Sequence, residues 1–107
     1  MDINQVMQQA QQFQKRMADI QNELAGQQLT STVGGGMVIV TVNGKNDLLA
    51  IKIEREVINP DDPNLLQDLI VAGVNDAMRK AREAMQTEMQ KLTGGMNIPG
   101  LSGIFGS

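Results

Sequence analysis

Apolar residues recur at steps of three and four along two long stretches of the chain, and between these stretches they form a β-branched run. The spacing in the first stretch predicts a long amphipathic helix that begins after Asp2, a suitable N-cap, and ends at Gly26. Its apolar seam consists of Ile3, Met7, Ala10, Phe13, Met17, Ile20 and Leu24. The positions between these residues are almost all polar and rich in Gln, so this helix should pack along one seam only.

The middle of the chain predicts three strands joined by two turns. The candidate strands are residues 29–33, 37–42 and 48–53. A run of three glycines separates the first two strands, and Asn43-Gly44 begins the second turn, because Asn and Gly tolerate the positive φ of tight turns. We take Ile39 as the strand residue that joins the packing between sheet and helix. This pattern predicts an antiparallel meander with one face covered by helix.

A second long helix should run from about Pro63 to Leu92, because Pro fits the first helical turn and helical spacing resumes there. Its seam consists of Leu66, Ile70, Val74, Ala77, Ala81, Met85 and Leu92. At about 1.5 Å per residue this helix spans on the order of 40 Å, more than a three-stranded sheet can cover. Its far end should therefore project or meet another chain.

These elements predict an α/β (α+β) fold with a long N-terminal helix, a three-stranded antiparallel sheet and a long C-terminal helix. We expect a single α-β-β-β-α dimerising domain over residues 1–93 and a flexible tail containing Gly and Pro over residues 94–107. A chain of 107 residues is too small to bury the seams of two long helices by itself. The pattern therefore predicts an obligate homodimer.

The composition argues against catalysis. The chain has no His and no Cys, which removes imidazole and thiolate chemistry, disulfides and the usual zinc ligands. Asp61 and Asp62 fit a helix start better than a metal site, and Ser102 has neither a nucleophile elbow nor a His to activate it. We expect no enzyme activity, catalytic residue, metal, cofactor or small-molecule substrate. No stretch approaches the roughly 20 apolar residues of a membrane span, so we also expect a soluble protein without a membrane partner.

The charge distribution gives a second set of candidate residues. The net charge of −3 taken alone argues against nucleic acid, because phosphate binding depends on Lys and Arg. Only residues 75–92 are net basic, through Arg79-Lys80-Ala81-Arg82, and Lys15-Arg16 is the next concentration of positive charge.

The alternative for these cations is a solvated helix face on which opposite charges neutralise one another. Three pairs have the i, i+4 spacing that favours this: Asp76 with Lys80, Arg79 with Glu83, and Lys15 with Asp19. Arg82 has no acidic residue at that spacing, so it should be the least compensated cation of its helix.

Segments along nearly the whole chain resemble the YbaB/EbfC family of small bacterial nucleoid-associated proteins. They are the Gln/Met-rich residues 6–14, Gly-Gly-Gly-Met-Val-Ile-Val-Thr-Val-Asn-Gly at 34–44, residues 66–70 and 75–77, and Gly-Met-Asn-Ile-Pro-Gly at 95–100. The resemblance implies a homodimer whose sheets join at the centre and whose helices project as paired arms, like tweezers. It also implies binding of double-stranded DNA with little sequence specificity in the bacterial cytoplasm, at the nucleoid, with effects on compaction and gene expression.

Two hypotheses of function follow. In the first, the dimer binds DNA through the cations of its helical arms: Lys15, Arg16, Arg79, Lys80 and Arg82. In the second, it is a non-catalytic helical adaptor or chaperone-like protein that binds other proteins through its Met-rich seam and tail. DNA binding should weaken steeply with salt, whereas apolar binding to a protein should persist.

Overall fold

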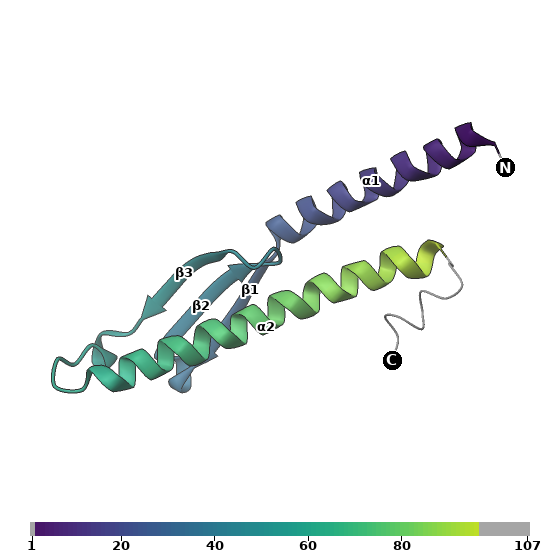
Figure 1. Cartoon of the computed structure of the whole chain (residues 1–107). Coiled ribbons are helices and arrows are strands. Elements are labelled where there is room, and N and C mark those ends of the chain that lie inside the picture. Colours follow the sequence, from purple (N-terminus) through teal and green to yellow (C-terminus); the bar gives the residue numbers. More distant parts are fainter. Residues whose placement is uncertain (1, 97–107) are drawn as a thin grey trace.

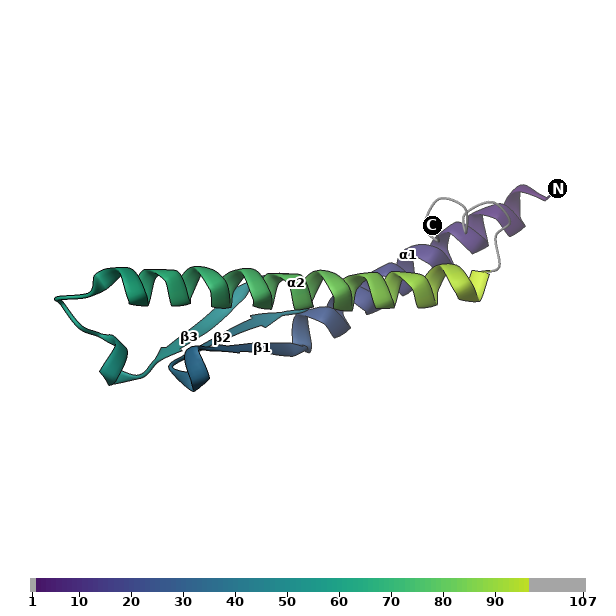
Figure 2. The same cartoon turned by 90° about the horizontal axis from the view of Figure 1, so that it is seen from below.

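The structure is a computed structural model that describes residues 2–96. Its elements, in chain order, are α1 (Ile3–Gly26), β1 (Gln28–Val33), the short turn η1 (Gly34–Gly36), β2 (Val38–Asn43), β3 (Leu48–Ile53), the short turn η2 (Arg55–Val57) and α2 (Pro63–Met96). The strands form an antiparallel sheet in the order β1-β2-β3. α2 crosses one face of this sheet, and α1 and α2 both extend beyond the same end of it (Figures 1 and 2). The predicted fold class is confirmed, and the molecule is elongated, with extents of 70 × 27 × 16 Å.

α1 is attached to the rest of the molecule at its C-terminal end. The Asp2 side chain caps the free end of the helix by accepting a hydrogen bond from the Asn4 amide at 3.1 Å, as predicted. At the other end Leu24 is buried, and its carbonyl accepts a hydrogen bond from the Gly44 amide at 2.8 Å. A Cβ at Gly44 would lie 2.8 Å from that carbonyl oxygen, so only glycine lets the β2–β3 turn approach the helix this closely.

Both predicted turns use residues that tolerate positive φ. Gly34, Gly35 and Gly36 have φ values of 63°, 68° and 97°, and Asn46 in the second turn has a φ of 72°. Asn43 organises the second turn, because its side-chain oxygen accepts hydrogen bonds from the amides of Lys45 and Asp47, both at 3.0 Å. These two turns set the order of the strands.

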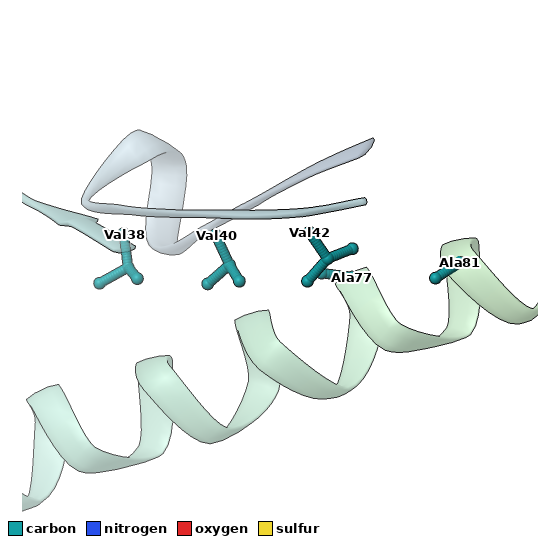
Figure 3. Close-up of a cluster of buried hydrophobic side chains, with 5 residues drawn as sticks. All are labelled: Val38, Val40, Val42, Ala77 and Ala81. Atoms are coloured by element: carbon teal, nitrogen blue, oxygen red, sulfur yellow. The ribbon is translucent and has the colours of Figure 1, made fainter. Parts of the chain in front are cut away.

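The core lies between β2 and α2. Val38, Val40 and Val42 are fully buried and point toward α2, where Ala77 and Ala81 complete the cluster (Figure 3). Partly buried apolar residues surround it: Leu29, Val33, Ile53, Leu66, Leu69 and Val74.

The prediction that Ile39 joins this packing is wrong. Side chains alternate along a strand, so Ile39 lies on the opposite face of β2 from Val38 and Val40. It pairs with Thr32 and Lys52 there and is only half-buried. The physical reason is that Thr41 shares the Ile39 face, whereas the other face of β2 carries only valines.

Small residues of α2 set its distance from the sheet. Gly73 is buried, and a Cβ built there would lie 2.8 Å from Cγ2 of Val40. Ala77 and Ala81 follow at intervals of four, so the helix presents little side-chain bulk to β2. The sequence prediction included both alanines but missed Gly73.

α2 is longer than predicted, because it continues past Leu92 to Met96. Glycine lowers helix stability by about 1 kcal/mol but does not forbid helical backbone, so Gly94 and Gly95 do not end the helix. Residues 97–107, which include most of the predicted tail, lie outside the described residues. Met85, predicted to lie in the seam, is 42% exposed.

Among the described residues, α1 and β3 each leave several apolar side chains uncovered in the single chain. Along α1, Ile3 is 74% exposed, and Val6, Met7 and Phe13 are exposed as well. The other surface follows β3, which α2 does not cover: Leu48, Leu49 and Ile51 are all exposed. The seam predicted for α1 therefore exists in the sequence, but only its last residue, Leu24, is buried in the chain itself.

Replacement of a core valine tests the assignment of faces. Val40→Ala should lower the free energy of unfolding by about 2 kcal/mol, because it removes buried carbon and leaves a cavity. Ile39→Ala removes more carbon from the other face and should cost less. Urea denaturation of both variants at one protein concentration measures the difference, and a larger loss for Ile39→Ala would mean that the faces are reversed.

Gly73→Ala should destabilise the protein even though Ala favours a helix interior by about 1 kcal/mol over Gly, because the new Cβ would press on Val40. In a Val40→Ala background the same change should cost less, since the contacting methyl is gone. Gly26→Ala is the control, because nothing lies within 4 Å of a Cβ there. Additive losses for Gly73→Ala and Val40→Ala would contradict direct contact between the two positions.

Candidate nucleic-acid interface

Two of the predicted contact residues, Lys15 and Arg16, lie on α1 and are exposed. Neither forms an ion pair within 4.0 Å with another residue of the part that the structure describes, so the predicted pair between Lys15 and Asp19 does not form. Arg16 also lines a hollow between the two helices. The other residues around this hollow are Asp19 and Ile20 of α1 and Glu88, Lys91 and Leu92 of α2.

Arg79 lies between two acidic side chains of its own helix. Its Nη2 is 2.7 Å from Asp76 Oδ1, and its Nη1 is 2.8 Å from Glu83 Oε1. The pair with Glu83 was predicted from the i, i+4 spacing, whereas the pair with Asp76, at i, i+3, was missed. Both terminal nitrogens of this guanidinium therefore already donate to carboxylates.

Lys80 reaches from α2 to the sheet. Its Nζ donates to the carbonyl of Thr30 in β1 at 2.7 Å and lies 3.9 Å from Asp76 Oδ2. The second contact is the predicted i, i+4 pair, at the outer limit of an ion pair. Lys80 thus satisfies a backbone carbonyl of β1, an edge strand of the sheet.

Asp76 connects these groups to the core. Its Oδ2 accepts a hydrogen bond at 2.8 Å from Oγ of Ser31, a fully buried residue of β1. Ala77 and Ala81 beside it pack on Val42 and its neighbours (Figure 3). Arg79 and Lys80 therefore lie where α2 packs along the sheet, at the root of the projecting arm.

The hydrogen bonds of this network favour the charged forms of Asp76 and Arg79. The Arg79 side chain, and after it the Ser31 hydroxyl, lower the pKa of the Asp76 carboxyl below its usual value. In turn Asp76, and after it Glu83, raise the pKa of Arg79 above its usual value. The network contains two acidic and two basic side chains, so its formal charges sum to zero.

Arg82 differs from its neighbours. It is exposed, and within residues 2–96 no carboxylate lies within 4.0 Å of it, in agreement with its predicted lack of compensation. Lys15, Arg16 and Arg82 are thus the unpaired members of the predicted set. The Thr30 and Ser31 contacts were missed, and no local spacing could have revealed them, because they join residues 45 to 50 positions apart.

The described part of the chain shows neither a metal-binding cluster nor a membrane-spanning helix. No group of three or more Asp and Glu side chains is placed there to hold a metal ion. None of its helices has the length and apolar character needed to cross a bilayer.

The chain is similar to bacterial proteins named nucleoid-associated proteins. It is 52% identical over 100 residues to one from Clostridium acetobutylicum, and the aligned region covers 94% of this chain and 89% of that protein. It is 51% identical over 102 residues to one from Desulfotalea psychrophila, and the aligned region covers 95% of this chain and 96% of that protein.

The fold is similar to the crystal structure of an uncharacterized protein from Helicobacter pylori, with a TM-score of 0.79 and 23% sequence identity. This match covers 86% of the chain and 97% of the Helicobacter protein. Residues 1–96 match the sequence profile of a family described as the YbaB/EbfC DNA-binding family. This match and the relatives confirm the resemblance seen in the sequence, and the chain belongs to the YbaB/EbfC DNA-binding family.

Proposed function

We propose that this protein binds duplex DNA as a homodimer with little sequence specificity and acts at the nucleoid, in the cytoplasm, on nucleoid organisation and gene expression. The observation that carries this proposal is the presence on the two long helices of three exposed cations that form no ion pair within 4.0 Å in residues 2–96, namely Lys15, Arg16 and Arg82. Family membership and the names of the relatives support the same partner.

Little sequence specificity follows from the kind of contact that is available. Lys and Arg on a helix surface neutralise phosphates, and phosphate contacts position a protein on DNA without reading its bases. The sequence contains only two aromatic residues, both Phe, so stacking on unpaired bases has little support. Duplex DNA therefore fits this surface better than single strands do.

The two edges of the sheet support a dimer formed through β3. At the β1 edge the Lys80 side chain donates a hydrogen bond to the Thr30 carbonyl, and α2 packs against the strand. β3 has neither protection and exposes Leu48, Leu49 and Ile51. An exposed, apolar edge strand readily pairs with another strand, and β3 of a second copy would supply that strand. Such pairing would join the two sheets and leave both pairs of helices projecting.

The uncovered apolar stripe of α1 favours the alternative function, a protein-binding adaptor. Ile3, Val6, Met7 and Phe13 are all exposed on this helix. Salt separates the two functions, because release of counterions makes DNA binding weaken with a log–log slope of about −0.9 for each phosphate contact. Binding that is insensitive to salt would favour the adaptor.

Charge reversal at Arg82 tests the DNA proposal. Arg82→Glu should weaken binding to all duplex sequences about equally, and the salt slope should become shallower by about 0.9 for each phosphate that the variant no longer neutralises. Arg55→Glu is the matched control, because Arg55 is exposed in η2, at the end of the sheet away from the arms (Figure 1). Fluorescence anisotropy with labelled duplexes at several salt concentrations measures both effects, and circular dichroism checks the fold. Equal affinity of the Arg82→Glu variant and the wild-type protein would exclude Arg82 as a contact.

Sedimentation velocity tests the dimer. The wild-type protein should sediment as a dimer, and Ile51→Glu should shift it toward monomer by placing two like charges at the joined edge. Thr32→Glu introduces the same charge at an exposed position of β1, the other edge strand, and should leave the dimer intact. A folded wild-type monomer at micromolar concentration would contradict the dimer, and dissociation by Thr32→Glu alone would move the interface to β1.

A further inference from the structure

Four charged side chains of α2 form one connected network without net charge. Asp76 lies 2.7 Å from Arg79 and 3.9 Å from Lys80, and Glu83 lies 2.8 Å from Arg79. Asp76 is therefore in contact with both cations of the network. Three residues after Arg79, the exposed Arg82 forms no ion pair within 4.0 Å with any of residues 2–96.

The position of Asp76 is fixed by the core and not only by its charged neighbours. Its Oδ2 accepts a hydrogen bond from Ser31, whose hydroxyl is fully buried under α2 and needs an acceptor there. If this carboxylate swung away when a phosphate approached Arg79, the buried Ser31 hydroxyl would lose its acceptor, which is unfavourable. The phosphate would have to displace Asp76 from the guanidinium and would meet its negative charge at short range.

Stability alone gives a weak reason for the ion pairs. The side chains of Arg79 and Asp76 are 51% and 36% exposed, and ion pairs this exposed contribute little to folding. Ser31 needs a hydrogen-bond acceptor, and an amide oxygen would also accept from its hydroxyl, although through a weaker bond than a carboxylate makes. The charge of Asp76 is therefore the feature that remains to be explained.

We propose that Asp76 limits the affinity of the protein for DNA by holding Arg79 and Lys80 in a neutral network at the root of the arm. This inference rests on the proposed function. It divides the predicted contact residues into cations that are available to phosphate, namely Lys15, Arg16 and Arg82, and cations that Asp76 withholds. A weak, sequence-tolerant hold on DNA is the consequence.

The test is Asp76→Asn, which removes the charge and keeps an oxygen acceptor for Ser31. If the released cations neutralise one more phosphate for each chain, a dimer neutralises two more, and the variant should lose about tenfold more affinity than the wild-type protein when the salt rises fourfold. Its affinity at low salt should exceed that of the wild-type protein. Asp68→Asn is the matched control, because Asp68 is exposed on the same helix and forms no ion pair within the described part of the chain.

A second comparison separates release of these cations from a general change in charge. In a background with Arg79→Gln and Lys80→Gln, Asp76→Asn should change the affinity no more than Asp68→Asn does. A persistent rise in affinity in that background would show that Asp76 acts by another route and would overturn the inference. Circular dichroism of each variant checks the fold, and sedimentation checks the oligomeric state.

The outcomes also separate the inference from the proposed function. If the wild-type protein binds duplex DNA and Asp76→Asn matches Asp68→Asn, the inference fails and the proposed function stands. If Asp76→Asn binds and the wild-type protein does not, the inference holds and the proposed function fails for the unmodified chain. If neither binds at low salt, both fail.

Discussion

The close approach of α2 to β1 and β2 is the contact on which the rest of the structure depends. Gly73, Ala77 and Ala81 let the helix lie directly against the valines of β2. α2 has 34 residues and each strand has six, so much of the helix extends beyond the sheet. The same contact leaves β3 uncovered, since one helix cannot span the full width of the sheet. The core thus determines both the projecting arm and the exposed edge.

Local signals predicted most of this fold, and they failed where tertiary packing decides. The glycine run and Asn43-Gly44 predicted the turns, and helical spacing predicted both helices. The packed face of β2 was predicted wrongly because β-branched residues occupy both faces, and only Thr41 indicates which face meets water. Gly73 was missed because nothing in the local pattern requires a glycine there. The uncovered seam of α1 shows that an amphipathic pattern predicts a helix without identifying what covers it.

In the candidate site, too, the sequence predicted contacts within one helix and missed contacts between the helix and the sheet. Spacing of four residues predicted the pairs of Lys80 with Asp76 and of Arg79 with Glu83, which both form. The predicted pair of Lys15 with Asp19 does not form, whereas the likewise exposed Arg79 and Glu83 do pair, so i, i+4 spacing alone does not decide which ion pairs form. The contacts of Asp76 with Ser31 and of Lys80 with Thr30 depend on how α2 crosses β1, so only the folded structure reveals them.

An acidic chain in a DNA-binding family is less contradictory than its net charge suggests. Charges in water act on one another over about 8 to 10 Å at moderate salt, so a phosphate responds to the nearest side chains and not to the sum over the molecule. Lys15, Arg16 and Arg82 form no ion pair within 4.0 Å with a described residue, although Asp19 and Glu88 line the same hollow as Arg16. Near Arg79 and Lys80, the carboxylate of Asp76, which accepts a hydrogen bond from the buried Ser31, reduces the positive charge. Ser31 positions that acid as β1 and α2 come together, so under our proposal folding itself determines which cations of the helix stay available to a phosphate.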